Sequence, residues 1–337
     1  MKTKVLVTGG SGAVGTPLLQ LLSLQDKYDV TVFDLANRKT RKAYLPYRDK
    51  IKVEYGDLTN VHQVESVCKN VDVVIHLGAI IPPMADENPD LAYRVNVEGT
   101  ENLILSLERY SANAFFIYAS SVSVYGDRLN NPQITTNDPL IPSYGDEYAK
   151  TKIEAEKLLM ASSLNWSIFR LSAIFGINNL RVTGLMFHMP LGTPIEFTTP
   201  EDTARAFYHA LEKQEVLNRK VFNLGGGETC RISYQQFLSR SFAISGLGQL
   251  NFPEKAFADK NFHCGYYADG DELEELLSFR RDSVSSYFSK LEQSTSVIQK
   301  TMTSLFNRFI KGYLLKLSEP YQAYQENDER ALERYFT

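Results

Sequence analysis

Two tyrosines and two lysines stand close together in the stretch YGDEYAKTK, residues 144 to 152. On a helix, residues four apart lie on the same face, one turn above the other. Tyr148 and Lys152 have this spacing. Tyr144 has only Tyr148 at that offset, and Lys150 points away from Tyr148. Because an ammonium close to a phenol favours the phenolate, we expect Lys152 to lower the pKa of Tyr148 towards neutrality. Such a tyrosine can exchange a proton with a substrate oxygen.

Serines that follow a buried apolar run could bind the same oxygen. The run ends in YASSVSVYG, residues 118 to 126. In a parallel open sheet, the carboxyl ends of the strands border the ligand crevice. Ser120, Ser121 and Ser123 are therefore candidates to hydrogen-bond a substrate, and the helix that begins at Tyr148 should overhang the same edge. A Tyr–Lys pair alone is common by chance, so the combination indicates the site.

The elements that position these residues alternate between strands and helices. Short apolar runs, rich in β-branched and aromatic residues, predict strands at 4–8, 30–34, 51–55, 71–76, 114–119 and 166–171. Helical periodicity lies between them, at 14–24, 61–68, 92–108 and 148–162. This alternation predicts an α/β fold with a Rossmann-type, doubly wound parallel sheet.

A glycine-rich turn joins the first strand to the first helix. It reads TGGSGAVG and places Gly9, Gly12 and Gly15 at three-residue steps. A pyrophosphate needs a tight turn, close approach to the backbone, and the free N–H groups and positive dipole end of a helix N-terminus. The turn therefore predicts a dinucleotide site.

A carboxylate at the end of the second strand bears on the choice of cofactor. Asp34 can accept hydrogen bonds from ribose hydroxyls and would repel a 2′-phosphate, which favours NAD over NADP. Arg38, Lys39 and Arg41 follow closely and could neutralise a phosphate, so NADP stays open. Asp57 follows the third strand, where it either reaches the adenine amine or caps the next helix.

These motifs and several others resemble the extended branch of the short-chain dehydrogenase/reductase family. The resemblance covers residues 3 to 230 and rests on TGGSGAVG, Asp34, GDL at 56–58, HLGA at 76–79, NVEGT at 96–100, SSVSVYG at 120–126, YAKTK at 148–152 and RLSAIFG at 170–176. The family comprises NAD(P)-dependent epimerases, dehydratases and dehydrogenases, built on a Rossmann core with a small C-terminal substrate lobe.

The resemblance implies roles for individual residues. Tyr148 would be the acid/base, Lys152 would also hold the nicotinamide ribose, and Ser121 would polarise the substrate oxygen. Cofactor contacts are implied along the other motifs, at Ser11, Gly12, Ala13, Val14, Leu58, Leu77, Gly78, Ala79 and Asn96.

At several positions this chain lacks residues that are typical of particular family subtypes, and these differences disfavour some reactions. Sugar-nucleotide dehydratases carry an Asp-Glu pair where this chain has Val122 and Ser123, so a 4,6-dehydratase is set aside. Nucleotide-sugar enzymes tend to have an asparagine where this chain has Ala173. The 177–200 segment is largely apolar around Arg181 and His188, which suits an apolar ligand or lobe core better than a diphosphate; Arg231 remains a candidate phosphate ligand.

Three functions follow from this pattern. The leading one is an oxidoreductase that interconverts a secondary alcohol and a ketone, on a substrate without a nucleotide. The alternative is an NAD-dependent nucleotide-sugar epimerase. A non-catalytic, NAD-sensing binding protein is the third, and the intact Ser–Tyr–Lys set speaks against it.

The remainder of the chain indicates a second lobe and an extension. We expect a Rossmann core at 1–176, with 201–224 rejoining it, a discontinuous substrate lobe at 177–200 and 225–282, and a helical extension at 283–337. Apolar residues at three- and four-residue steps over 283–317 predict one long amphipathic helix or two shorter ones. This helical face could pack on the lobe, form a homodimer or, with its interleaved lysines and arginines, lie on a membrane.

Composition sets the outer bounds. The chain has 337 residues, 43% of them hydrophobic, and a net charge of −4, which argues against a nucleic-acid surface. Three scattered cysteines and five dispersed histidines suggest neither disulfides nor a metal site. We see no signal peptide and no apolar run of about 18 residues that could span a membrane, so we expect a cytoplasmic protein.

Overall fold

The computed structural model describes residues 1–177 and 184–336. Seven parallel strands form its main sheet, in the order β10-β7-β5-β4-β1-β2-β3. Their bounds are β1 Thr3–Thr8, β2 Tyr28–Asp34, β3 Lys52–Tyr55, β4 Val73–His76, β5 Phe115–Ser121, β7 Asn165–Leu171 and β10 Lys220–Leu224. The predicted fold class and all six predicted strands of the first half are confirmed. The strand order reverses between β1 and β4, which is where an open parallel sheet places its ligand crevice.

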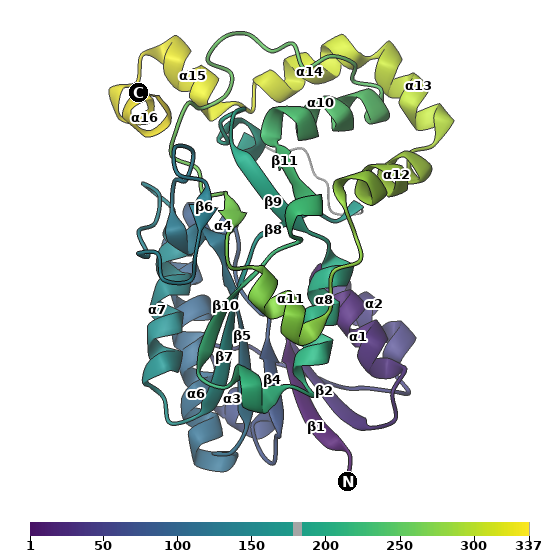
Figure 1. The fold of residues 1–337 in the computed structure, drawn as a ribbon, viewed down its shortest axis with the longest axis vertical. Coiled ribbons are helices and arrows are strands. Elements are labelled where there is room, and N and C mark those ends of the chain that lie inside the picture. Colours follow the sequence, from purple (N-terminus) through teal and green to yellow (C-terminus); the bar gives the residue numbers. More distant parts are fainter. Residues whose placement is uncertain (178–183, 337) are drawn as a thin grey trace.

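Helices cover both faces of this sheet (Figure 1). One face carries α1 Gly15–Ser23, α2 Arg38–Tyr44, α8 Pro200–Ala210 and α11 Asp271–Leu277. The other carries α3 Val61–Val67, α6 Gly99–Tyr110 and α7 Glu147–Ala161, with the short helices α4 Met84–Glu87 and α5 Pro89–Tyr93 near the start of α7. Two apolar cores result, one on each face of the sheet.

A smaller lobe lies beyond the carboxyl ends of the strands (Figure 1). Its three-stranded sheet has the order β11-β9-β8, and a two-stranded sheet pairs β12 with β6. The elements are β6 Gln133–Ile134, β8 Ala173–Ile174, β9 Pro194–Thr198, β11 Arg231–Ser233, α10 Tyr234–Ser245 and β12 Tyr266–Tyr267. The glycines and prolines at 182–197 predict a loop, and this prediction is wrong for β9, because β9 pairs antiparallel with β11.

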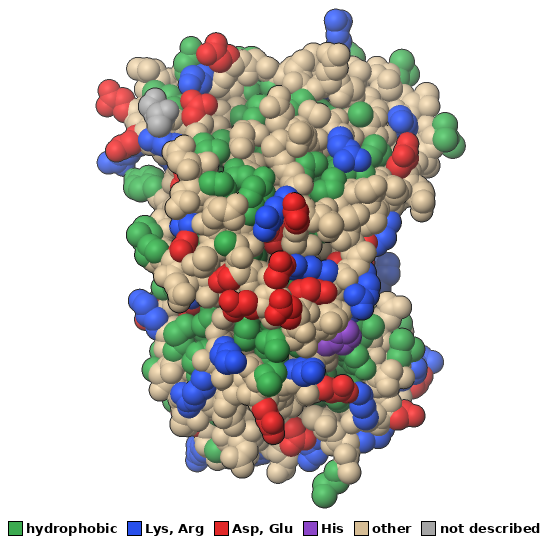
Figure 2. Space-filling view, in the orientation of Figure 1, with side chains coloured by type: hydrophobic (Ala, Val, Ile, Leu, Met, Phe, Trp, Pro, Cys, Tyr) green, Lys and Arg blue, Asp and Glu red, His purple; other side chains and the backbone are tan. Residues whose placement is uncertain are grey.

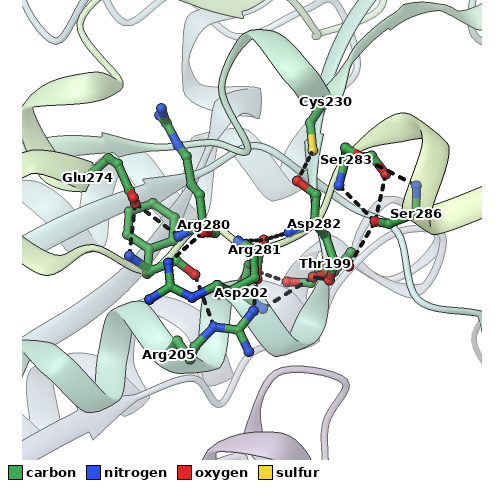
Figure 3. Close-up of polar contacts among 12 residues, drawn as sticks. Thr199, Asp202, Arg205, Cys230, Glu274, Arg280, Arg281, Asp282, Ser283 and Ser286 are labelled. Atoms are coloured by element: carbon green, nitrogen blue, oxygen red, sulfur yellow. Dashed lines mark hydrogen bonds and ion pairs between the residues drawn. The ribbon is translucent and has the colours of Figure 1, made fainter.

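A hydrogen-bonded junction leads the chain into its C-terminal helices (Figure 3). Asp202 on α8 accepts hydrogen bonds from the backbone N–H groups of Arg281, at 3.0 Å, and Asp282, at 2.9 Å. Thr199, which caps α8, donates to the Asp282 carboxylate at 2.8 Å. Since Asp202 and Thr199 are both buried, this junction fixes the extension to the core.

The extension consists of several short helices, α12 Val284–Ser294, α13 Val297–Leu305, α14 Asn307–Leu315, α15 Glu319–Glu326 and α16 Glu329–Tyr335. The prediction of one or two amphipathic helices over 283–317 is therefore wrong, because three helices span that stretch. Ser296 lies between α12 and α13 and is the N-cap of α13. Its side chain accepts a hydrogen bond from the Gln299 N–H. Within the described residues, no helix has the length and apolar character needed to cross a membrane.

Candidate active site

Tyr148 lies near the start of α7, facing the end of β5. Asp146 caps the helix and accepts a hydrogen bond from the Ala149 N–H at 2.8 Å. Burial raises the pKa of Tyr148 well above its usual range, a hydrogen bond with the Ser121 side chain lowers it, and the charge of Asp146 raises it. Ser121 and Tyr148 thus share one site, as the sequence predicted.

Lys152 lies one helical turn further along α7 and is 3% exposed. Its Nζ donates to the backbone carbonyl of Ala119 at 2.8 Å and lies 5.6 Å from the centroid of the Tyr148 ring. Burial lowers the pKa of Lys152 to about 7, and the nearby carboxylate of Glu156 raises it. A lysine with this pKa can still change its protonation state near neutrality.

The expected direction of the Tyr148 pKa is wrong. The helical spacing does place Lys152 beside Tyr148, but burial penalises the charged form of both groups. The tyrosine consequently keeps its proton more firmly than in water, while the lysine loses its proton more easily.

Of the three candidate serines, only Ser121 faces Tyr148. Neighbouring residues of a strand point to opposite sides of the sheet. Ser120 therefore points to the face of the sheet that α7 covers, and it donates to the buried carboxylate of Glu156, two turns beyond Tyr148 on that helix. The hydroxyl of Ser123 is buried without a hydrogen-bond partner among the described residues, and its N–H donates to the Ser121 hydroxyl at 3.2 Å.

The glycine turn is closely packed against the end of β4. Gly9 has a left-handed φ of +67°, and a Cβ there would come within 2.7 Å of the Gly78 backbone. A Cβ on Gly15 would meet the backbone of Gly10 at 2.6 Å. Gly12 faces more open space, and no side chain caps α1 among the described residues. The free N–H groups and the absence of side chains suit a pyrophosphate.

Asp34 lies beside this turn with its carboxylate already hydrogen-bonded. One oxygen accepts from the Ser11 hydroxyl at 2.7 Å and from the Tyr44 hydroxyl, and the other from the Leu35 N–H at 2.8 Å. Nothing in the sequence indicated Tyr44, which lies ten residues further along on α2. Arg41, one of the cations that keep NADP open, stacks on Tyr55 at 4.7 Å.

Two predicted cofactor contacts have other partners in the structure. Asn96 is 1% exposed. Its side-chain oxygen accepts a hydrogen bond from the Ile80 N–H at 2.7 Å, and its side-chain nitrogen donates to the Ile80 carbonyl at 2.9 Å and to the Thr151 hydroxyl at 3.0 Å. Asn96 thereby joins the segment after β4 to α7. Asp57 does not cap α3, whose cap is Asn60. Its carboxylate instead accepts from Thr59 at 2.9 Å.

The remaining predicted cofactor residues surround the glycine turn. Gly78 donates its N–H to the Thr8 hydroxyl at 3.1 Å, which joins HLGA to the end of β1. A Cβ on Gly78 would lie 3.3 Å from the Leu58 side chain, so the GDL motif at 56–58 lies beside the HLGA motif. Leu77, two residues before Ala79, donates its N–H to the Thr8 carbonyl at 3.2 Å. Ala13 and Val14 lie within the turn itself.

A buried ion pair under α7 was not foreseen. Arg170 on β7 binds the carboxylate of Glu156 at 3.1 Å and 2.7 Å, and donates to the Tyr125 hydroxyl at 2.8 Å. Tyr125 donates in turn to Asn223 on β10 at 2.8 Å. The sequence feature that could have indicated this ion pair is Glu156, a charged residue one turn beyond Lys152 on the same helical face.

The lobe residues considered as ligands are largely used for packing. Arg231 donates to the buried carboxylate of Glu196 at 2.9 Å and to the Tyr267 carbonyl at 3.0 Å, so two of its nitrogens already have partners within the lobe. Phe187 and Met189 belong to the apolar core of the lobe, which explains much of the apolar character of that segment. His188 lies 3.3 Å from the Glu319 carboxylate on α15. Arg181 lies outside the described residues.

Comparisons with known proteins identify the family to which this sequence is similar. The sequence model of the 3-beta hydroxysteroid dehydrogenase/isomerase family matches residues 6–177. The sterol-4-alpha-carboxylate 3-dehydrogenase (decarboxylating) of Saccharomyces cerevisiae is 31% identical over 248 residues, which cover 67% of this chain and 69% of the yeast protein. A 3-beta-hydroxysteroid dehydrogenase of Mycolicibacterium neoaurum is 32% identical over 168 residues, 48% of this chain and 43% of that protein.

A solved structure shows the same fold over most of the chain. The UDP-glucuronic acid 4-epimerase from Bacillus cereus, in complex with UDP-glucuronic acid and NAD, is similar with a TM-score of 0.69 and 21% identity. The match covers 86% of this chain and 99% of that one. The similarity therefore includes the lobe as well as the sheet.

Proposed function

This chain belongs to the 3-beta hydroxysteroid dehydrogenase/isomerase family, within the extended short-chain dehydrogenases/reductases, and from that premise we propose that it interconverts a secondary alcohol and a ketone by NAD-dependent hydride transfer. The observation that supports this reaction is the contact between Ser121 and Tyr148 beside the buried Lys152. These three side chains lie at the carboxyl edge of the sheet, where the glycine turn also lies.

Each of these residues has a distinct role in the proposed reaction. The glycine turn and the N-terminus of α1 bind the pyrophosphate, and Asp34 is placed for the adenosine ribose. Bound NAD supplies the hydride acceptor, or NADH the donor. Ser121 hydrogen-bonds the substrate oxygen, and Tyr148 gives that oxygen a proton in reduction or takes one in oxidation. Lys152, held by the Ala119 carbonyl, places its positive charge beside the Tyr148 ring.

The raised pKa of Tyr148 makes the two directions unequal. At neutral pH the tyrosine holds its proton, so it is ready to act as the acid in ketone reduction. In alcohol oxidation it must first lose this proton, which becomes easier as the pH rises. The positive charge of Lys152 favours that loss, and its own pKa of about 7 sets the pH above which the charge declines.

Two features support a substrate without a nucleotide. Arg231 is paired with Glu196, and Ala173 stands where nucleotide-sugar enzymes tend to have an asparagine. The names of the yeast and mycobacterial relatives make a hydroxylated sterol or steroid the first substrate class to test. A nucleotide-sugar epimerase is the alternative, in which Arg231 would contribute to binding the diphosphate.

The test compares two tyrosines on the same segment. Tyr148→Phe keeps the ring but removes the proton relay, so ketone-dependent NADH consumption should fall at least about 100-fold with unchanged NADH affinity. Tyr144→Phe is the matched control, because Tyr144 is 71% exposed, and it should keep full activity. Full activity in Tyr148→Phe would end the mechanistic proposal. Turnover of a UDP-sugar without net NADH consumption would favour the epimerase.

A further inference from the structure

Helices α13 and α14 expose a dense group of large apolar side chains. Among the nine residues of α13, all described by the structure, none is buried. Seven large apolar residues between positions 297 and 313 are 44% to 81% exposed, namely Val297, Ile298, Met302, Leu305, Phe306, Phe309 and Tyr313. We call these residues the 297–313 face. Monomeric soluble proteins rarely expose such a cluster without a binding partner.

The inner side of the two helices is fixed to the lobe. Gly246 ends α10 with a left-handed φ of +88°, and a Cβ there would come within 2.3 Å of the Lys300 carbonyl. On α14, the Lys311 ammonium donates to the Gln249 carbonyl at 2.6 Å and to the Asn251 side chain at 2.5 Å. With this side held in place, the 297–313 face lies at the end of the molecule opposite the amino ends of the strands (Figure 1).

The charge around this face is opposite to that of the whole chain. Residues 293–318 contain no aspartate or glutamate and four cations, Lys300, Arg308, Lys311 and Lys316. The whole chain has a net charge of −4, so this is a local concentration of positive charge. Lys300, Arg308 and Lys316 are exposed, and Lys or Arg side chains project from the upper edge of the molecule (Figure 2).

This combination of charge and exposure selects one occupant. A twofold dimer would place the 297–313 face against its own copy. The three exposed cations Lys300, Arg308 and Lys316 would then lie near the same three cations of the copy, with no carboxylate in 293–318 to balance them. A lipid surface with anionic headgroups instead buries the apolar side chains and neutralises the cations. We propose that the 297–313 face docks the protein on an anionic lipid surface.

Vesicle co-sedimentation of the full chain tests this proposal. Wild type should sediment with vesicles of phosphatidylcholine and phosphatidylglycerol, and far less with phosphatidylcholine alone. Binding should weaken as salt is raised, because salt screens the cations. Replacing Lys300 and Arg308 by glutamine should weaken binding by about fivefold for each cation and reduce the salt dependence.

Apolar-to-acidic variants separate this face from apolar exposure in general. Leu305→Glu and Phe309→Glu should each weaken vesicle binding at least about tenfold. Leu24→Glu is the matched control, since Leu24 is 66% exposed at the end of α1 and Leu305 is 71% exposed. The control should bind like wild type, and the helical content of all three variants should be unchanged.

Three results would overturn the proposal. The first is no wild-type binding to anionic vesicles, and the second is an equal loss of binding in Leu24→Glu. The third is concentration-dependent self-association that Phe309→Glu abolishes, which would assign the face to a second copy of the chain. None of these results depends on hydride transfer, so they leave the proposed reaction to its own test.

Discussion

Replacing Glu156 by glutamine removes one charge of the buried ion pair under α7. The Glu156 and Arg170 side chains are 1% and 4% exposed, so water screens neither of them. Glutamine keeps the size of the side chain but leaves the guanidinium without a countercharge, and Ser120 loses a charged acceptor. Breaking a buried pair costs about 3–5 kcal/mol. Since two of the hydrogen bonds from Arg170 end on this carboxylate, we expect a loss near the upper end, about 4–5 kcal/mol.

Urea unfolding measures this loss as a difference in the free energy of unfolding. Glu154→Gln, on the same helix, is the control. Glu154 pairs with Lys157 at 3.2 Å, and these side chains are 44% and 66% exposed. Such a surface pair contributes less than about 1 kcal/mol, so the control should be nearly as stable as wild type.

Equal losses in Glu156→Gln and Glu154→Gln would refute the reasoning. A double variant, Glu156→Leu with Arg170→Met, sharpens the test because it removes both charges together. Buried pairs replaced by apolar residues are often neutral in stability, so the double variant should recover most of the loss. Persistent instability would instead point to the hydrogen bonds of Ser120 and Tyr125 as the stabilising contacts.

Three further predictions concern the cofactor and the reaction. Asp34→Ala should raise the use of NADP relative to NAD at least about tenfold in kcat/KM; an unchanged ratio would show that another group sets the preference. Gly9→Ala should abolish NAD binding because its Cβ would meet Gly78 at 2.7 Å, whereas Gly248→Ala, at φ +75° with nothing within 4 Å, should cost only about 1 kcal/mol of stability. Alcohol oxidation should accelerate between about pH 6 and pH 9 while ketone reduction does not, since burial raises the pKa of Tyr148; parallel profiles would contradict this role.

The sheet and the catalytic edge could be predicted because they follow from local pattern and topology. Most of the strand residues are apolar, which predicts strands buried on both faces; β3, at the edge of the sheet, is the exception, with Lys52 exposed. Once the strands are parallel, the end of β5 and the start of α7 must share an edge. This places Ser121 and Tyr148 together without any knowledge of side-chain contacts.

The C-terminal extension could not be predicted in detail, because its apolar pattern continues across the helix ends. Three- and four-residue steps persist through Ser296 and Phe306, where the structure ends one helix and begins the next. The structure also packs α13 against the end of α10, where Gly246 closely approaches Lys300, a contact that the apolar pattern does not predict. The predicted amphipathic character is present, but it belongs to several short helices.

The hydrogen-bond partners of the polar side chains also depend on residues that are distant in the sequence. A carboxylate at a strand end predicts a ribose ligand, yet Asp34 also accepts from Tyr44 on α2. An asparagine in a family motif predicts a cofactor contact, yet Asn96 makes its hydrogen bonds to Ile80 and Thr151. Sequence spacing indicates where a side chain lies along its element, and only the packed structure shows what it binds.

The pKa shifts of Tyr148 and Lys152 likewise could not be predicted from helical spacing. Helical spacing predicts proximity, and proximity alone would lower the pKa of the tyrosine. Burial acts on each group separately and opposes its charged form, whichever charge that is. Because Tyr148 and Lys152 share one water-poor edge, burial raises the first pKa and lowers the second. Helical spacing therefore predicts which two groups lie close together, but the direction of each pKa shift depends on how far the packed structure excludes water from them.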